Sequence, residues 1–545
     1  MSDADVIVVG AGLSGLVTAT ELTARGKRVL LLEAETAKNL GGQAWWSFGG
    51  LLLVDTPEQR RLGVNDSAEL ALRDWTRAAN FAPGAEDGTG PDAQGHAWAR
   101  RYVAFAAGPM REWLRAKGVR WFPLVQWAER AYSSVPRFHV TWGTGPGLLE
   151  PFVRAARQAR RDGLLDVRFG HQVTELVATD GEVAGVRALV LPADPGPRGV
   201  GRTRWQPVGE VQLRADHVVI AGGGIGADHE MVRELWPPAA GRLPEEMLSG
   251  VPGSTSGALL GISATAGAAL VHRERMWHYP EGVAMPGPVW HRHGIRILPG
   301  PSSLWLDADG GRFPVPLFPG FDALGALRQI TGRGDDYSWF VANRAIMETE
   351  FALSGSDQNP DLTDKDVREL VRRVLPRSVS PVARLASHSP DFLWADSPAE
   401  LAARMNDLVG VDRIDARALT ELITERDSQA ATGLGHDPQL AAISHARQYP
   451  VDRRIRVHPP RPLRTPQDGP LLAVRLRVLT RKTLGGLHTN GSGQVLRPDG
   501  SVLPGLWAVG ESAGFGGGGV HGERSLEGTF LGGCLFTGRV VGRTI

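Results

Sequence analysis

Residues 5–15 read DVIVVGAGLSG, a short apolar run that leads directly into three spaced glycines, Gly10, Gly12 and Gly15. A helix-like stretch and a second apolar run follow, and that second run ends at Glu33. Strand, glycine turn, helix, strand and acid stand in the order of a dinucleotide-binding βαβ unit. The sequence therefore predicts that the chain begins with such a unit.

Each part of this pattern has a physical role. Gly10 permits a tight turn, Gly12 lets the backbone approach a pyrophosphate, and Gly15 lets helix and strand pack closely. The helix amides and dipole favour phosphate charge, and Glu33 can accept hydrogen bonds from the hydroxyls of an adenosine ribose. Three glycines alone would fit an ordinary turn, so the interpretation depends on the flanking strands and the acid.

The composition is that of an ordinary globular protein with at least two domains. The chain has 545 residues and a net charge of +1, which gives no reason to expect nucleic acid or an anionic membrane as partner. The single cysteine, Cys534, excludes an internal disulfide and argues against a cysteine-built zinc site, so we expect no metal. We expect a soluble cytoplasmic protein, without a signal peptide or a transmembrane segment.

The middle of the chain mixes helices with strands. Predicted helices cover residues 67–80, 98–117, 148–161 and 529–543, and predicted antiparallel strands cover residues 167–169, 172–177 and 183–191. A further strand at residues 216–220 runs into Ala221-Gly222-Gly223, which suits a return to the first sheet. Residues 493–500 have the pattern of a hairpin.

Residues 276–449 differ in character from their surroundings. Prolines, tryptophans and short helical stretches alternate there, for instance at residues 364–374 and 398–409. We interpret this segment as an inserted domain. The nucleotide-binding domain is then discontinuous, with a first part at residues 1–275 and a second part at residues 450–545.

A second strand–glycine–acid pattern near the C-terminus bears on the cofactor. Residues 504–509 are followed directly by Gly510-Glu511. An NAD dehydrogenase has no need of such an acid, whereas FAD is long enough for an acid here to hold its ribityl hydroxyls while its adenine end lies near Glu33. Alone, the acid would fit a plain strand-to-turn junction. Together with the N-terminal unit it favours FAD.

Further motifs resemble those of the FAD-dependent oxidoreductases that include fumarate reductase flavoproteins and 3-ketosteroid Δ1-dehydrogenases. The resembling stretches are Gly41-Gly42-Gln43 with Gly49-Gly50, Thr483-Leu484-Gly485-Gly486-Leu487, residues 504–511, and His521-Gly522-Glu523-Arg524-Ser525-Leu526. The resemblance implies an α/β fold in which a discontinuous Rossmann-like FAD-binding domain carries an inserted α+β domain that caps the flavin and binds the substrate.

The pattern and the resemblance together give a set of expected FAD contacts. They are Gly10, Gly12, Leu13, Ser14, Gly15, Glu33, Ala34, Gly41, Gly42, Gln43, Ser47, Gly49, Gly50, Val173, Ala221, Gly222, Gly223, Gly510, Glu511, Ser525 and Leu526. Members of the family that bind flavin covalently carry a histidine where this sequence has Gln43. The resemblance therefore implies non-covalent FAD.

The family reaction adds or removes hydrogen across a carbon–carbon bond next to a carbonyl or carboxylate. Arg524 stands where a fumarate reductase carries its carboxylate-binding arginine, which implies a role in stabilising an enolate or a carboxylate. His521 belongs to the same motif. A structural role for Arg524, paired with Glu523 or Glu527, is the alternative.

Three further residues are candidates for the catalytic set. Lys482 follows Arg481 where fumarate reductases have a substrate-binding histidine pair, although two exposed basic residues before a turn are equally plausible. His278 resembles the His-Pro position at the family's substrate pocket, but a lone histidine is more often structural. Tyr279 can donate a hydrogen bond to a carbonyl or, when its pKa is lowered, act as a base.

The sequence also departs from both known catalytic sets. Fumarate reductases place a proton-donating arginine eight residues after the arginine of a Gly-x-Arg-Phe motif. Here that motif arginine is Arg312, and the position eight residues later is Gly320. Ketosteroid dehydrogenases carry tyrosines in a Phe-Pro loop and near the C-terminal glycines. Here the loop, at Phe122-Pro123, has no tyrosine, and Arg524 stands near the second place.

The predicted function is FAD-dependent dehydrogenation or reduction of a carbon–carbon bond next to a carbonyl, with a steroid-like or cyclic ketone favoured over a small dicarboxylate. The partners would be that small-molecule substrate and an unidentified electron acceptor or donor. Two alternatives are a fumarate-reductase-like enoate reductase and a flavin-binding protein without turnover. A NAD(P)-dependent dehydrogenase is disfavoured by Gly510-Glu511.

Overall fold

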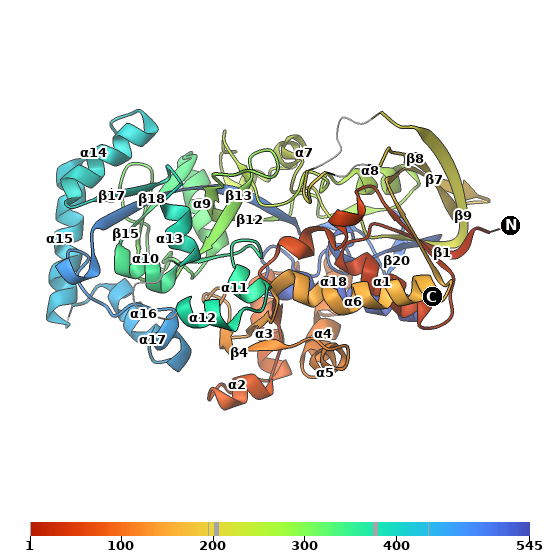
Figure 1. Cartoon of the computed structure of the whole chain (residues 1–545), viewed down its shortest axis with the longest axis horizontal. Helices are drawn as coiled ribbons and strands as arrows, with labels where there is room; N and C mark the ends of the chain where they lie inside the picture. Colours follow the sequence, from red (N-terminus) through yellow and green to blue (C-terminus); the bar gives the residue numbers. More distant parts are fainter. Residues whose placement is uncertain (1, 194–195, 201–205, 374–379, 434) are drawn as a thin grey trace.

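The computed structural model describes residues 2–193, 196–200, 206–373, 380–433 and 435–545. A mostly parallel sheet organises the end of the molecule at which both termini lie (Figure 1). Its strands, in spatial order, are β20 (Gln494–Leu496), β21 (Val502–Ala508), β9 (Gly209–Ile220), β1 (Ala4–Val9), β2 (Val29–Glu33) and β6 (Leu165–Phe169), while β7 (His171–Thr179) and β8 (Glu182–Val190) join through β9. This is the predicted Rossmann-like domain.

The N-terminal βαβ unit forms as the residue pattern predicts. β1 lies parallel between β2 and β9, with Val6 opposite Val29 on one side and His217 on the other. Residues 6–9 are at most 4% exposed, so both faces of β1 are covered, which is why it contains an almost continuous β-branched run. Helix α1 (Leu13–Thr23) follows the glycine turn and is buried along nearly its whole length.

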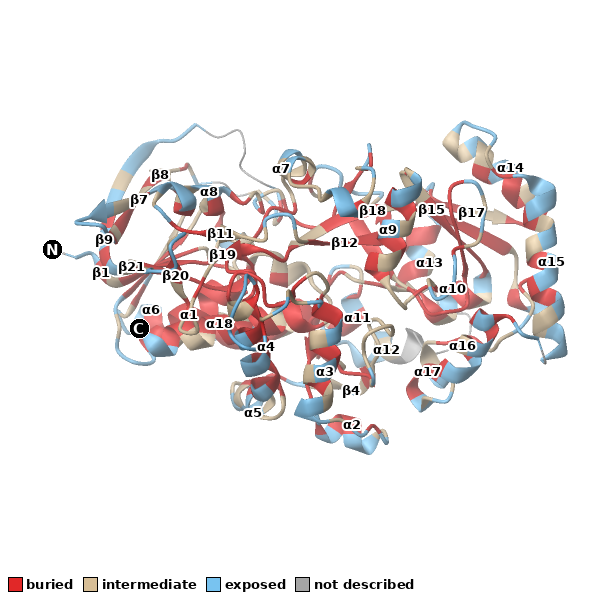
Figure 2. Cartoon of the chain, turned by 180° about the vertical axis from the view of Figure 1, so that it is seen from behind, coloured by how far each residue is buried: buried red, intermediate tan, exposed pale blue. Residues whose placement is uncertain are grey.

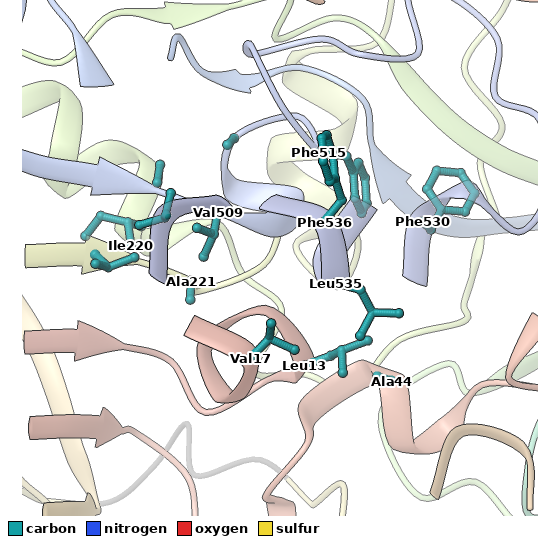
Figure 3. Packing of buried hydrophobic residues seen from close by; sticks show 14 of the residues in the cluster. Leu13, Val17, Ala44, Ile220, Ala221, Val509, Phe515, Phe530, Leu535 and Phe536 are labelled. Carbon is teal, nitrogen blue, oxygen red and sulfur yellow. The ribbon is translucent and has the colours of Figure 1, made fainter. Parts of the chain in front are cut away.

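The C-terminal segments complete this sheet, so the domain is discontinuous as predicted. β21 pairs in parallel with β9, and α18 (Thr529–Thr544) packs on α1. The helices approach closely because α18 has a glycine at the crossing: a Cβ on Gly538 would lie 2.7 Å from the carbonyl oxygen of Ser14. Figure 3 shows Leu13 and Val17 of α1 and Leu535 of α18 in this shared core.

A second sheet forms the inserted region. Its strands are, in spatial order, β14 (Leu304–Leu306), β15 (Tyr337–Asn343), β18 (Leu471–Thr483), β12 (Met276–Ala284), β13 (Gly294–Leu298) and β16 (Ala352–Leu353), with β10 (Leu248–Ser249) and β17 (Phe392–Ala395) also paired to β18. The long strand β18 lies beyond residue 449, the expected end of the insert. The domain boundaries stay a prediction, but this sheet extends past them on both sides.

Helices cover the second sheet and the remaining surface. Around the second sheet lie α9 (Ala323–Arg333), α10 (Arg344–Glu350), α11 (Pro360–Thr363), α12 (Val367–Arg373), α13 (Pro381–Ala386), α14 (Pro398–Val409), α15 (Ala416–Thr432), α16 (Pro438–Ala446) and α17 (Pro450–Ile455). Figure 2 shows largely buried strands and exposed outer faces of α14 and α15. Among the described residues, every helix is too short or too polar to span a bilayer.

The other elements link the two sheets. They are α2 (Pro57–Arg61), α3 (Ala68–Ala79), α4 (Ala93–Ala106), α5 (Pro109–Ala116), α6 (Thr144–Arg161), α7 (His229–Glu234), α8 (Ala258–Thr265), a small sheet of β3 (Gly50–Leu52), β5 (Phe138–Thr141) and β4 (Trp121–Gln126), and the pair β11 (Leu270–Val271) and β19 (Gly486–Leu487).

Three details of the expected secondary structure were wrong. The helix expected at residues 98–117 is two helices, α4 and α5, because Gly108 has a φ of 136° and Pro109 starts a new helix. The strand at residues 167–169 belongs to β6, which runs parallel to β2. A short alternating run carries no information on strand direction. The helix expected at residues 364–374 is shorter: α12 begins at Val367 and is described as far as Arg373. Residue 374, the last one of the expected helix, lies outside the described residues.

Candidate active site

A cavity of about 380 Å³ lies between the two sheets. One wall comes from the first sheet, at the carboxyl ends of β1 and β2 and at β7, and the opposite wall comes from β12, β13 and β18. The carboxyl edge of a parallel sheet is the usual ligand position in this type of fold. The cavity is long, because it reaches from Glu33 to Tyr279.

The glycine turn leaves room for a ligand beside the start of α1. A Cβ on Gly10 would lie 2.5 Å from the carbonyl oxygen of Ala221, so this turn tolerates only glycine. A Cβ on Gly12 would meet no atom within 4 Å, and Gly12 lines the cavity. No side chain caps the N-terminus of α1 among the described residues. Its first amides are therefore available to a phosphate.

The acid at the end of β2, Glu33, is held in place by two backbone N–H groups, one from the glycine turn and one from its own loop. The Oε2 of Glu33 accepts a hydrogen bond from the N–H of Ala11 at 2.8 Å, and its Oε1 accepts one from the N–H of Glu35 at 2.9 Å. The carboxylate thus lines the cavity one strand away from the glycine turn. This is the arrangement that binds a ribose beside a pyrophosphate.

A second acid lies in the middle of the cavity and joins three distant segments. Glu511 accepts a hydrogen bond from Gln43 Nε2 at 3.0 Å through Oε2, and from the N–H of Thr483 at 2.9 Å through Oε1. Lys482 Nζ donates to Gln43 Oε1 at 2.6 Å and lies 3.5 Å from Glu511 Oε2. Burial lowers the pKa of Lys482, whereas the nearby Glu511 carboxylate opposes this effect.

The far end of the cavity carries a phenol, an arginine and a carboxylate in direct contact. The hydroxyl of Tyr279 donates to Glu527 Oε1 at 2.8 Å, and Arg296 Nη1 donates to the same oxygen at 2.9 Å. The guanidinium carbon of Arg296 lies 3.8 Å from the centre of the Tyr279 ring. Burial, together with Glu527, raises the pKa of Tyr279 well above its usual value.

The geometry describes a long site with a phosphate cradle at one end and polar groups at the other. A family model for the FAD binding domain matches residues 5–531. The chain belongs to this FAD-binding family. The predicted family and cofactor are confirmed: the protein binds FAD, for which the open wall at Gly12, the uncapped amides of α1 and the two acids Glu33 and Glu511 are suited.

Known relatives extend over nearly all of this FAD-binding chain. A KsdD-like steroid dehydrogenase of Mycolicibacterium smegmatis is 52% identical over 540 residues, which cover 97% of this chain and 96% of that protein. A 3-ketosteroid Δ4-(5α)-dehydrogenase structure from Rhodococcus jostii RHA1, in complex with 4-androstene-3,17-dione, has a TM-score of 0.63 at 21% identity and covers 99% of this chain and 97% of that one.

A further solved structure shares the fold at low sequence identity. A 3-ketosteroid Δ1-dehydrogenase of Sterolibacterium denitrificans, in complex with 1,4-androstadiene-3,17-dione, has a TM-score of 0.67 at 16% identity and covers 99% of each chain. Identity this low shows the shared architecture alone. The capped FAD-binding fold that the sequence predicted is thereby confirmed.

Most of the predicted site residues of this FAD-binding protein line the cavity. They are Gly10, Gly12, Leu13, Ser14, Glu33, Ala34, Gly41, Gly42, Gln43, Ser47, Gly49, Gly50, Val173, Ala221, Gly222, Gly223, Tyr279, Lys482 and Glu511. Gly15 and Gly510 lie behind the lining: a Cβ on Gly15 would lie 1.9 Å from the carbonyl oxygen of Gly10, and one on Gly510 would lie 2.6 Å from Ser14 Oγ. Their role is close packing.

Arg524, Ser525 and Leu526 line a second, smaller cavity beside the large one. The guanidinium of Arg524 pairs with Asp322 of the capping region and lies 4.3 Å from the centre of the Tyr132 ring. Glu523 and Glu527, the partners considered from the sequence, pair instead with Arg328 and Arg296. The enolate-stabilising role predicted for Arg524 would therefore require a rearrangement toward the large cavity.

The two candidate histidines are buried outside the cavity walls. His278 Nδ1 accepts a hydrogen bond from the N–H of Arg481 at 3.0 Å, and its ring stacks on Trp236. His521 contacts Thr529 Oγ1 at 2.9 Å through Nε2 and stacks on Trp75. Burial lowers the pKa of each to about 3. Both placements are those of structural histidines.

His521 should make the stability of the protein depend on pH. Its folded-state pKa of about 3 lies below the usual 6.5, so the unfolded chain binds one more proton between these values. The free energy of unfolding should fall as the pH falls below 6.5, by up to about 1.4 kcal/mol per unit for this group. His521→Gln should reduce the slope of unfolding free energy against pH by one proton. An unchanged slope in denaturant titrations at pH 7, 6 and 5 would contradict this.

Sequence analysis missed the residues that surround Tyr279. Arg296 and Glu527 line the cavity, and Glu281 and Glu129 contact Arg296. One local signal was present: Glu281 follows Tyr279 by two positions, a spacing that places two side chains on one face of an extended strand. The other members come from distant segments.

Proposed function

We propose that the protein is an FAD-dependent dehydrogenase that acts on the carbon–carbon bond next to the carbonyl of a neutral, steroid-like ketone. The observation that carries this proposal is the charge at the far end of the cavity. Arg296 is paired there with three carboxylates, Glu281, Glu527 and Glu129. An arginine so neutralised does not favour a second anion, which disfavours a dicarboxylate substrate.

Other features support a neutral ring-containing substrate. Apolar side chains of Phe138, Leu298 and Phe530 line the same cavity and can contact a hydrocarbon skeleton. The 52% identical relative carries the name of a steroid dehydrogenase. We further infer a cytoplasmic location, with which one cysteine in 545 residues is consistent, and an electron acceptor of unidentified chemistry.

In the proposed reaction the cofactor accepts the hydride, and residues of the chain bind the cofactor and exchange the proton. Bound FAD supplies the hydride acceptor. Gly12, Glu33 and Glu511 would hold it, and Lys482 places a cation beside Glu511 in the middle of the cavity. Tyr279 lines the far end of the cavity, and we infer that its hydroxyl exchanges a proton with the substrate there.

The fumarate-reductase-like alternative has less support. The position of that family's proton-donating arginine is Gly320, whose backbone has a φ of 76° and whose added Cβ would lie 3.0 Å from the carbonyl oxygen of Pro299. No side chain reaches the cavity from that position. The second alternative, a flavin-binding protein without turnover, is distinguished from a dehydrogenase by the titration described next.

The test is anaerobic titration of the purified holoprotein. We expect 4-androstene-3,17-dione, or another neutral 3-ketosteroid in a panel, to bleach the visible flavin band, and succinate to leave it unchanged. Bleaching by succinate alone would contradict the proposal. Absence of bleaching by any compound, with normal reduction by dithionite, would favour the flavin-binding protein without turnover.

A further inference from the structure

A buried cluster of charge lies beside Tyr279 at the far end of the large cavity. Arg296 of β13 donates from Nε to Glu281 Oε2 at 3.1 Å, from Nη1 to Glu527 Oε1 at 2.9 Å, and from Nη2 to Glu129 Oε1 at 3.0 Å. The three carboxylates come from β12, from the segment before α18 and from the loop between β4 and β5. The guanidinium therefore joins the capping sheet to two segments of the flavin side.

The cluster contains more acid than base. Three carboxylates face Arg296, and Arg481 is the further cation near Tyr279 and Glu527. Full ionisation of all three would leave a net negative charge in a buried place, which is unfavourable. Burial raises the pKa of Glu129 to about 8 against the attraction of Arg296, and the other two carboxylates add to the rise. The cluster is thus suited to hold a proton near neutral pH.

Tyr279 connects this cluster to the large cavity. Tyr279 lines the cavity, and its hydroxyl donates to Glu527 Oε1 at 2.8 Å, where Trp277 Nε1 also donates at 3.2 Å. This oxygen thus accepts three hydrogen bonds, the third from Arg296, and one of them brings the proton of the Tyr279 hydroxyl directly to Glu527. A phenol that binds a proton on its cavity side can release its own to Glu527.

The second cavity connects Glu527 to the surface side of the cluster. Glu527 and Phe138 line both cavities, and Glu129 lines the second one. Its volume of about 20 Å³ is room for about one water molecule. The side chain of Glu129 keeps 13% of its surface exposed, against 1% for Glu281 and 11% for Glu527. Because Glu129 lines the second cavity and not the large one, we take it as the member that exchanges protons with solvent.

We propose that Glu527 accepts, through the Tyr279 hydroxyl, the proton that leaves the substrate carbon next to the carbonyl, and that Glu129 returns it to solvent. The substrate C–H bond breaks, its proton forms a new O–H bond on Tyr279, and the original Tyr279 proton passes to Glu527. The electron pair left on the carbon forms the new double bond to the neighbouring carbon, whose hydride the bound FAD would accept. Glu527 and Glu129 act through Tyr279, and the proposal rests on the proposed function.

The test measures proton abstraction without hydride transfer. Holoprotein reduced beforehand with dithionite is incubated in D2O with a saturated 3-ketosteroid, which can neither donate hydride to the reduced flavin nor accept it. Deuterium entering the carbons next to the carbonyl is followed by mass spectrometry. Glu527→Gln keeps an oxygen that accepts hydrogen bonds but cannot take the proton, so exchange should fall about 10²–10³-fold. Glu527→Asp, which keeps a carboxylate, should recover part of the rate.

Glu281→Gln is the matched control, since it removes a carboxylate from Arg296 that Tyr279 does not contact. Its exchange rate should stay within about tenfold of the native rate. The exchange rate of the native protein, plotted against pH, should show the titration of one group. This titration should be absent from the same plot for Glu527→Gln. The charged and titratable groups facing Glu527 are Tyr279, Arg296, Arg481, Glu281 and Glu129, and Asp322 faces Glu129.

The outcomes separate the two proposals. Native protein that is bleached by ketosteroids but shows no exchange, or a Glu527→Gln variant that exchanges at the native rate, overturns the proton path and leaves the dehydrogenase intact. Native protein with neither bleaching nor exchange overturns both. If Glu527→Gln does not retain FAD, Glu129→Gln takes its place, because it leaves the Tyr279 contact intact; we expect about tenfold slower exchange, and a native rate would refute the path.

Discussion

Flavin reduction by a neutral 3-ketosteroid should slow about 10³-fold when Tyr279 is replaced by phenylalanine. The change removes one oxygen, the atom that donates to Glu527 Oε1, from a side chain that lines the cavity. The ring itself remains under Arg296, so the packing of β12 against β13 should persist. The rate is measured by stopped-flow bleaching of the oxidised holoprotein, and the FAD content is measured after gel filtration.

Tyr132→Phe is the control for the Tyr279 variant. It makes the same chemical change in the second cavity, where Tyr132 stacks with Arg524 rather than with Arg296. Its flavin reduction should be close to the native rate. A Tyr279→Phe protein that keeps native FAD content and native reduction would remove Tyr279 from the chemistry and leave Lys482 as the candidate in the cavity.

Two alanine substitutions in the glycine turn should differ in their effects on the stability of the apoprotein and on its affinity for FAD. Gly12→Ala should leave the apoprotein as stable as the native apoprotein, because its φ of −70° suits any residue and its Cβ meets no protein atom within 4 Å. FAD should bind about 10–100-fold more weakly, since an extra methyl in a tight contact costs about 1–3 kcal/mol.

Gly15→Ala should instead disrupt the βαβ unit itself. Its Cβ would lie 1.9 Å from the carbonyl oxygen of Gly10, so α1 must move away from the turn. We expect a lower unfolding temperature of the apoprotein and a colourless preparation. Unfolding temperatures and fluorescence titrations with FAD measure both effects. Native FAD affinity in Gly12→Ala would contradict a ligand site beside Gly12.

The FAD half of the site could be predicted from sequence because its signals are local. Gly10, Gly12 and Glu33 lie within one βαβ unit, so their spacing alone fixes their relation in space. The same holds for Gly510-Glu511 at the end of a strand. These residues act through backbone geometry, which the chain specifies over short distances.

The substrate half could not be predicted in the same way. Glu129, Arg296 and Glu527 are far apart in sequence and meet only because β12, β13 and two loops fold together. Arg524 shows the opposite case: its motif is local, but its partner is Asp322, on the capping region. Pairing over long sequence separations is a property of the packed structure.

The discontinuity of the first sheet has a consequence for how the protein is made. β1 and α1 leave the ribosome before α18, which packs on α1. At about 5–20 residues per second, the intervening chain takes about half a minute to two minutes to emerge. The nascent N-terminal unit must wait unfinished for that time. Loading of the flavin is therefore a late event of biosynthesis, after the capping region has already been translated.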